Sequence, residues 1–271
     1  APHLLMREEP ESQRLIEEVF EKEGIQLHSG CKPAKAWQTG GQIHILCACG
    51  RETSGSHLLL AAGRAPTLSS LDLDAAHVGY TPKGILVDRY GRTNQKNIWA
   101  VGDCTGQTPF THMAEFNGRH MLWNLLVPRL FWKKWHEPDD TPRVTYTDPE
   151  IAAMGLSEAE ALKKYGPNKI KVYTFPFSKL DRALTTGRSE GFVKVVTKKW
   201  SSKILGATVA APRAGEMLLE LSTAMFAGLP LRKLAEIVHP YPTYAQAIRK
   251  TADLWLTETL LPELKKWTGK N

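Results

Sequence analysis

Apolar positions at helical spacing open the chain. Leu15, Ile16 and Val19 share one face of a predicted helix, which covers residues 12–23 and ends at Gly24. Short alternating stretches follow, and Gly40 and Gly41 mark a hairpin turn between two of them. A second helix is predicted over 112–126. Strands are predicted at 24–28, 36–38, 42–49, 57–61, 85–88 and 98–101.

The last 130 or so residues show the same two periods in a different order, with most of the strands before most of the helices. Runs of strands followed by helices favour an α+β layer, packed here against an α/β portion. The fold class expected is therefore α/β plus α+β. The strands are predicted at 144–146, 171–177, 191–197 and 204–209. The helices are predicted at 157–165, 215–227, 231–238 and 244–261.

Composition narrows the functional class. The 271 residues carry a formal charge of +7, but the lysines and arginines are scattered and no nucleic-acid-binding pattern accompanies them. No nucleic-acid partner, transmembrane segment or secretory leader is expected. The aromatic and basic residues of 130–135 have two interpretations, a membrane-surface segment or a packed helix end. A linker is predicted after them at 137–140.

The cysteines are few, four in all, which favours a reducing compartment and a cytoplasmic location. Cys47 and Cys49 form a single C-x-C in a predicted strand. A zinc site would need two more ligands at regular spacing, and none is evident in the sequence. Two small buried side chains on one strand face are the simpler interpretation, and no metal site is expected.

Candidate chemistry begins where an apolar strand ends at Gly102 and Asp103. A glycine there allows a ligand to approach the backbone, and an aspartate at the end of a strand can accept hydrogen bonds from sugar hydroxyls. The helix predicted after it, from His112, presents N–H groups to an electron-rich ligand. Taken alone, a strand that ends in Gly-Asp is also typical of a plain turn.

Several segments together carry a family resemblance. They resemble the FAD-dependent pyridine nucleotide–disulfide oxidoreductases, in order and over essentially the whole chain. The second half resembles the opening and the middle strands of that family's dimerisation domain. The matching segments are 61–66, 84–88, 92–93, 97–103, 146–158, 191–194 and 204–207.

The resemblance implies an order of domains of which this chain matches the later part. Residues 1–64 resemble the back half of an NAD(P)-binding domain, 65–140 the returning part of an FAD-binding domain, and 141–271 the dimerisation domain. No G-x-G-x-x-G occurs in the sequence, and its cysteines do not fit the family's redox pair. The chain is expected to be a carboxyl-terminal portion of a longer flavoprotein; a natural truncated form and one half of a split enzyme are the alternatives.

The cofactors implied are FAD and NAD(P)H, both requiring the missing amino-terminal part. The partners implied are a second copy of the chain in a homodimer and a complementing amino-terminal fragment.

The resemblance also assigns roles to residues. Gly102 and Asp103 would contact the flavin ribityl chain, and Arg64 would lie where the nicotinamide and FAD domains meet. The backbone at the start of the next helix would lie beside the isoalloxazine, although His112 could equally bond only locally. That helix start comprises Thr111, His112, Met113 and Ala114.

On the acceptor side, the family's lipoamide dehydrogenases and glutathione reductases carry a His-Pro-Thr whose histidine acts as a base. Alignment on Pro242 and Thr243 puts Tyr241 at the histidine position, and Gln246 replaces the glutamate that orients the base. A phenol with a pKa of about 10 is a poor base at neutral pH. A tyrosine at position 241 therefore resembles the pattern of the mercuric reductases. Residues 260–271, however, lack the carboxyl-terminal cysteine pair of that branch.

His239 has two interpretations, a functional side chain or a cation at a helix C-terminus. The function expected is a flavoprotein oxidoreductase that passes electrons from NAD(P)H through FAD and a cysteine pair to a metal-ion or disulfide-type acceptor. A dihydrolipoamide dehydrogenase-like enzyme and a non-catalytic dimerisation module are the alternatives. In the latter, one apolar helix would supply the two-fold interface through Leu218, Leu219, Leu221, Met225 and Phe226.

Overall fold

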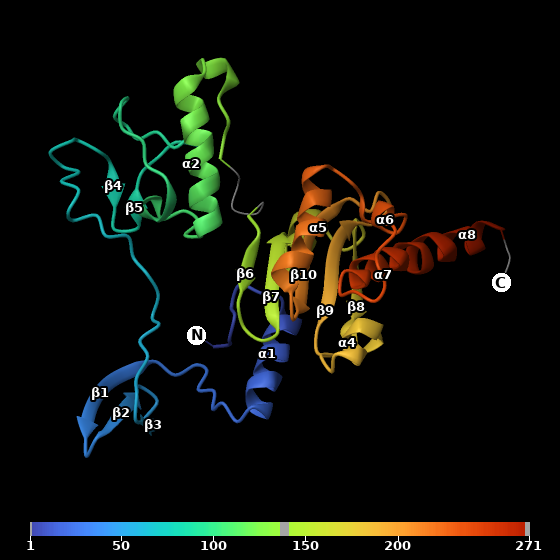
Figure 1. Cartoon of the computed structure of the whole chain (residues 1–271), viewed down its shortest axis with the longest axis horizontal. Coiled ribbons are helices and arrows are strands. Elements are labelled where there is room, and N and C mark those ends of the chain that lie inside the picture. Colours follow the sequence, from blue (N-terminus) through green and yellow to red (C-terminus); the bar gives the residue numbers. More distant parts are fainter. Residues whose placement is uncertain (1, 136–140, 269–271) are drawn as a thin grey trace. The chain divides into compact units, whose positions relative to one another are not determined.

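The computed structural model describes residues 2–135 and 141–268 (Figure 1). Contacts divide the chain into two compact units: Leu59–Thr141, and Ala1–Leu58 together with Pro142–Asn271. Within the described residues, no helix is both long and apolar enough to cross a membrane.

A five-stranded antiparallel sheet organises the larger unit, with the strand order β6-β7-β10-β9-β8. The central strand β10 pairs with β7 on one side and β9 on the other, so that Val209 lies between Ala152 and Val193. Every residue of β10 is buried, which requires cover on both faces of the sheet. The strands are β6 (Arg143–Thr145), β7 (Glu150–Gly155), β8 (Ile170–Pro176), β9 (Phe192–Lys198) and β10 (Ile204–Ala211).

The two faces are covered by different helices, as strand alternation dictates. Val193 and Val195 of β9 point into the main core, which α5 (Ala214–Phe226) and α7 (Gln246–Trp255) complete. The intervening side chains, Phe192 and Val196, face the opposite side. There α1 (Pro10–Lys22) packs through Ile16, and α3 (Glu158–Tyr165) packs through Ala161.

A lysine sits in the middle of this second face. Lys194 of β9 is 2% exposed, and its Nζ lies 3.1 Å from Glu9, 2.9 Å from Glu11 and 2.7 Å from Glu158. Burial alone would lower the pKa of Lys194, but hydrogen bonds from its ammonium to Glu158, Glu11 and Glu9 raise it well above the usual range. Burial likewise opposes ionisation of Glu11, yet Lys194 holds the pKa of that carboxyl below its ordinary value. The cluster ties the residues around the start of α1 to the sheet.

Smaller elements complete this unit. A three-stranded antiparallel sheet, in the order β1-β2-β3, precedes the smaller unit in the sequence. After α7 the chain continues through a π-helical segment (Leu256–Leu260). The remaining elements are β1 (Pro33–Thr39), β2 (Gln42–Cys47), β3 (Glu52–Gly55), α4 (Asp181–Thr185), α6 (Leu231–Leu234) and α8 (Leu261–Thr268).

The smaller unit has one long helix, α2 (Thr111–Leu126), and a two-stranded hairpin formed by β4 (Tyr80–Thr81) and β5 (Gly84–Ile85). Short 3₁₀ segments occur at Gly102–Thr105 and Arg129–Phe131. The hairpin turn packs so closely on the first of these segments that a Cβ on Gly106 would lie 1.8 Å from the Lys83 carbonyl oxygen. One hydrophobic cluster in the described part of this unit contains four buried side chains: Leu68, Val78, Ile85 and Ala100.

Several predicted elements differ from the structure. No strand forms at 24–28 or 57–61, and the third strand of the small sheet lies earlier, at Glu52–Gly55. The predicted strand at 98–101 makes a single bridge, between Trp99 and Arg92, because no longer strand lies beside it in the described part of this unit. The predicted helix at 231–238 ends at Leu234. The linker predicted at 137–140 lies outside the described residues.

The lysine cluster predicts the effect of Lys194→Met. The substitution leaves the carboxylate of Glu9, which is also buried, without its cation, and we expect it to lower the free energy of unfolding by about 3 kcal/mol. Lys203→Met, at an exposed lysine just before β10, is the matched control and should cost less than about 0.5 kcal/mol. Urea unfolding of both variants measures the difference, and equal stabilities would contradict the argument.

The same cluster sets a pH dependence with a definite sign. Because the folded pKa of Glu11 is lowered, its contribution is present above the ordinary glutamate pKa and is lost as the pH falls through the folded value. Because the folded pKa of Lys194 is raised, its contribution persists up to the ordinary lysine pKa and is lost only at still higher pH. The difference between the wild type and Lys194→Met should therefore shrink in acid, and urea unfolding at acidic pH tests this.

Candidate functional site

The Gly-Asp motif lies at a tight turn against α2. Gly102 has a φ of +77°, and a Cβ built on it would approach the Ala114 Cβ to 3.1 Å. Glycine is therefore required both by the left-handed backbone and by the close packing on the first turn of the helix. Two hydrogen bonds hold the turn: the Thr105 hydroxyl donates to the Gly102 carbonyl at 2.8 Å, and the Gly106 N–H donates to the Asp103 carbonyl at 3.0 Å.

This turn presents Asp103 to solvent. The side chain is exposed, and no hydrogen bond to its carboxylate is found among the described residues. An ionised carboxylate offers about four acceptor sites, so Asp103 can accept hydrogen bonds from two neighbouring hydroxyls of a polyol.

The start of α2 is the second part of the site. Phe110 precedes the helix in an extended conformation, no side chain caps it, and its first turn has no acidic residue. The N–H groups of Met113 and Ala114 donate to the Phe110 carbonyl at 3.0 Å. Met113 is buried and anchors the turn, whereas Thr111 and His112 are exposed. The opening N–H groups of such a helix favour an electron-rich ligand.

Two side chains define the approach to this helix start. The Arg64 guanidinium donates to the carbonyl of Pro109 at 3.2 Å. The His112 ring stacks on Phe110, with the ring centroids 5.3 Å apart. The structure therefore brings the predicted cofactor-binding residues of the smaller unit together, around the first turn of α2.

Tyr241 lies in the larger unit, on the loop between α6 and α7. Its side chain is 68% exposed, and its hydroxyl lies beside the carboxylate of Asp181, at the start of α4. Hydrogen bonding to this carboxylate, together with its negative charge, raises the pKa of the phenol above its ordinary value of 10.0. Tyr241 thus keeps its proton at neutral pH and can donate a hydrogen bond, but it cannot serve as a base.

His239, from the same loop, has a different environment. Its side chain is 5% exposed; Nε2 lies 2.9 Å from Glu220 of α5, and Nδ1 lies 2.9 Å from the Ile237 carbonyl. Both partners are acceptors, so the ring satisfies both contacts when each nitrogen carries a proton. In this arrangement His239 fastens the loop to α5. Gln246, at the position of the family's orienting glutamate, is the first residue of α7.

The sequence did not identify two carboxylates that contact the predicted site residues, Asp181 and Glu220. Asp181 opens a five-residue helix that no periodic pattern marks. Glu220 is a charged residue on a helix whose apolar positions dominate the pattern. Neither could be paired with its partner without the fold, since about 60 residues separate Asp181 from Tyr241 and about 20 separate Glu220 from His239.

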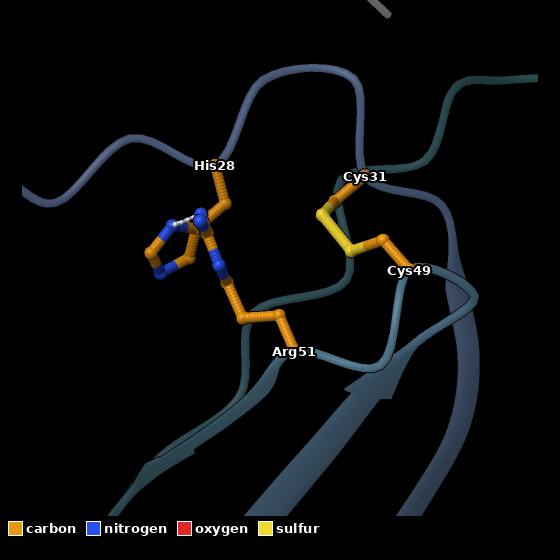
Figure 2. Close-up of a disulfide and its surroundings, with 4 residues drawn as sticks. All are labelled: His28, Cys31, Cys49 and Arg51. Atoms are coloured by element: carbon orange, nitrogen blue, oxygen red, sulfur yellow. Dashed lines mark hydrogen bonds between the residues drawn. A yellow bond between two sulfur atoms is a disulfide. The ribbon is translucent and has the colours of Figure 1, made fainter.

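The prediction for the cysteines is wrong. Cys49 lies in the turn after β2, not in the strand, and it forms a disulfide with Cys31 (Figure 2). Cys47, the last residue of β2, carries a free thiol. Cys31 thus supplies a third sulfur that the spacing of the sequence did not indicate.

Comparison with known proteins identifies the family. A model of the pyridine nucleotide–disulphide oxidoreductase family matches residues 1–118, and a model of that family's dimerisation domain matches residues 141–252. The chain belongs to the pyridine nucleotide–disulfide oxidoreductase family. The predicted family and fold class are confirmed.

The relatives of this oxidoreductase chain include more than one activity. It is 31% identical to a mercuric reductase of Streptomyces lividans, over 94% of this chain and 54% of the relative. It is also 31% identical to a dihydrolipoyl dehydrogenase of Thermus scotoductus, over 93% of this chain and 54% of the relative. LpdA from Mycobacterium tuberculosis superposes with a TM-score of 0.82 at 27% identity, over 91% of this chain and 53% of LpdA. The chain thus spans about half the length of these relatives.

The dimerisation domain of this oxidoreductase chain corrects the expected interface. Leu218 and Leu221 of α5 are buried in the domain's own core and cannot reach another molecule. Leu219 and Phe226 point outward, with 67% and 84% of their surface exposed. They are seven residues apart, which places them on one face of α5, two turns from each other.

The contact between Tyr241 and Asp181 predicts a change in the pKa of Tyr241 when Asp181 is replaced. In the variant Asp181→Asn the pKa of Tyr241 should fall toward its ordinary value of about 10, because the negative hydrogen-bond acceptor is gone. Tyrosine Cζ resonances followed by ¹³C NMR measure the pKa, with Tyr241→Phe to assign the signal. Tyr80 is an internal control, since Asp74 raises its pKa in the same way and is unchanged. A Tyr241 pKa that is the same in both proteins would contradict the contact.

Proposed function

We propose that this chain is the flavin-contacting and dimer-forming half of an FAD- and NAD(P)H-dependent oxidoreductase with a mercuric reductase-like acceptor side. Members of the family depend on FAD and NAD(P). The observation that carries the proposal is the cluster formed by Gly102, Asp103 and the first turn of α2. FAD, when bound, supplies a two-electron carrier between NAD(P)H and the acceptor.

The residues present fit part of FAD. Asp103 would accept hydrogen bonds from the ribityl hydroxyls, and the first turn of α2, Thr111 to Ala114, would place its backbone beside the isoalloxazine. Arg64, held on the Pro109 carbonyl, would position the loop that leads into that turn. The sequence contains no G-x-G-x-x-G, so the pyrophosphate cradle must come from another segment.

The acceptor side distinguishes the candidate reactions. A dithiol substrate needs a base to take up the thiol proton, and Tyr241, hydrogen-bonded to Asp181, holds its own proton instead. His239 is occupied by Glu220 and Ile237. A thiophilic metal ion bound by a cysteine pair requires no such base, which supports a metal-ion acceptor. A dihydrolipoamide-type acceptor is the second candidate, supported by the identity to the dihydrolipoyl dehydrogenase.

We also propose that the chain forms a homodimer. The dimerisation-domain match supports a second copy as the partner of the exposed face of α5. Ile237 and Val238, which precede His239, are exposed in addition to Leu219 and Phe226. In a two-fold interface the same patch occurs on both subunits, so one apolar face suffices. A non-catalytic dimerisation module would use this interface and no flavin. The cytoplasmic location stays a proposal that rests on the small number of cysteines.

The test of function uses the purified natural protein that contains this chain. We expect the visible spectrum of a bound flavin, and NAD(P)H oxidation that is faster with Hg(II) in excess thiol than with lipoamide. Faster oxidation with lipoamide would favour the dihydrolipoamide-type enzyme. A colourless protein without NAD(P)H oxidation would leave the dimerisation module.

Asp103→Ala predicts a loss of flavin affinity in that protein. A hydrogen bond to a charged group contributes about 1.5–3 kcal/mol, so the Kd for FAD should rise about 10- to 100-fold. Glu115→Ala is the control, because Glu115 is an exposed carboxylate on α2 that lies outside its first four residues. Titration of the deflavinated protein with FAD measures both values, and an unchanged Kd for Asp103→Ala would contradict the role of Asp103.

Phe226→Asp predicts a weaker dimer. A charge at the centre of an apolar two-fold contact appears twice in the interface, and we expect the dimer dissociation constant to rise at least about 100-fold. Trp200→Asp is the control, because Trp200 is exposed on the turn between β9 and β10, away from α5 in the sequence. Sedimentation velocity measures the mass, and a Phe226→Asp dimer as tight as the wild type would exclude this face.

A further inference from the structure

Three sulfur atoms converge beside the small three-stranded sheet. The Sγ atoms of Cys31, Cys47 and Cys49 all lie within 4.8 Å of one another. Among the described residues, no other histidine, cysteine, aspartate or glutamate joins this group. These three cysteines belong neither to the cluster formed by Gly102, Asp103 and the first turn of α2 nor to the loop that carries Tyr241.

The hairpin backbone brings the three residues together. Cys47 ends β2, and the following turn closes with the Cys47 N–H donating to the Arg51 carbonyl at 2.8 Å. Cys49 projects from this turn. The Ala48 N–H donates to the Lys32 carbonyl at 2.9 Å, which fixes the segment of Cys31 alongside the turn. The convergence is therefore a property of the backbone, and it does not depend on the disulfide alone.

In the state observed, two of the three sulfurs are joined. Cys31 and Cys49 form the disulfide, with Cα atoms 6.3 Å apart, and Cys47 is left as a partly buried thiol next to it. Figure 2 shows the Arg51 side chain directed toward His28 on one side of the disulfide. Its guanidinium donates to the His28 Nδ1 at 2.7 Å, so the two side chains are engaged with each other.

We propose that Cys31, Cys47 and Cys49 form a three-sulfur site for a soft d¹⁰ metal ion, Cu(I), which opens when the disulfide is reduced. A dithiol reductant supplies two electrons and two protons: the Cys31–Cys49 bond breaks, two cysteine thiols form, and the reductant becomes a disulfide. One Cu(I) ion then binds three thiolates, and the three thiol protons are released to solvent. While the disulfide is present, the site lacks two of its three ligands.

The geometry and the ligand chemistry select the ion. A metal–sulfur distance of about 2.3 Å places the sulfurs of a trigonal site about 4 Å apart, which the 4.8 Å limit on the observed separations accommodates. Thiolate ligands favour soft ions such as Cu(I). Structural zinc sites use four ligands in a tetrahedron, and the cluster provides three. Cu(I) therefore fits the site better than Zn(II).

The test is a Cu(I) titration of the chain in the absence of oxygen, after reduction with a phosphine and in competition with a Cu(I) chelator. We expect one Cu(I) per chain, with the luminescence of a Cu(I)–thiolate centre. Cys47→Ser should weaken binding on the order of 100-fold, since it removes one ligand. Cys104→Ser is the matched control and should bind as the wild type does, because Cys104 lies outside the cluster and donates to the Val101 carbonyl.

Three outcomes would overturn the proposal: equal Cu(I) affinity for Cys47→Ser and the wild type, equal affinity before and after reduction, or stronger binding of Zn(II) than of Cu(I). Thiol counting in denaturant checks independently whether the Cys31–Cys49 disulfide is present: the four cysteines should give two thiols before reduction and four after it. Four thiols before reduction would exclude the disulfide-bonded form of the site. Cys47→Ala, which preserves the hairpin backbone, separates ligand loss from misfolding, with circular dichroism as the readout. None of these measurements requires a flavin.

Discussion

Burial of the central sheet on both faces is the constraint on which the larger unit depends. All eight residues of β10 are buried, so neither face can remain in water. One face is covered by α5 and α7. The loop that carries Tyr241 leads into α7, and Glu220 of α5 holds it through His239. The other face is covered by α3 and by α1, from the far end of the chain. Lys194 lies on that second face, and its three carboxylate partners explain how a cation can be buried there while the helix packs beside it.

The sequence predicted those elements of the fold whose own pattern of apolar residues indicates which side chains are buried. The periodic apolar faces of α1, α2 and α5 and the apolar runs of β9 and β10 set the boundaries of these elements to within a few residues. The pattern failed where neighbours decide: residues 98–101 read as a buried strand, but a strand needs a partner, and the described part of the smaller unit offers a single bridge. Likewise β7 (Glu150–Gly155) begins with a charge and contains small residues, so its burial is visible only once β10 lies beside it.

The candidate sites also contain residues that the sequence could identify and residues that it could not. Gly102, Asp103 and the start of α2 were identifiable because a local turn and a helix start carry their chemistry within a dozen residues. The described part of the smaller unit around them has one cluster of four buried apolar side chains, with Met113 and Trp135 buried in addition, while Leu122, Leu125 and Leu126 of α2 remain exposed. The elements around the candidate site are therefore ordered by tight backbone packing, as at Gly102 and Gly106, more than by a deep hydrophobic core. The cysteine cluster was not identifiable from the sequence, because backbone hydrogen bonds at the hairpin bring Cys31 close to Cys47 and Cys49.

Two ionisable pairs in the larger unit bear on the proposed acceptor side. A histidine and a carboxylate are both present, as His239 and Glu220, but the ring is buried, and its two nitrogens are occupied by Glu220 and a backbone carbonyl. The exposed position belongs to Tyr241, whose neighbour Asp181 strengthens its hold on the proton. The exposed side chain of this loop is thus a phenol that keeps its proton. In the proposed reaction, thiol deprotonation would depend on other groups or on the acceptor itself.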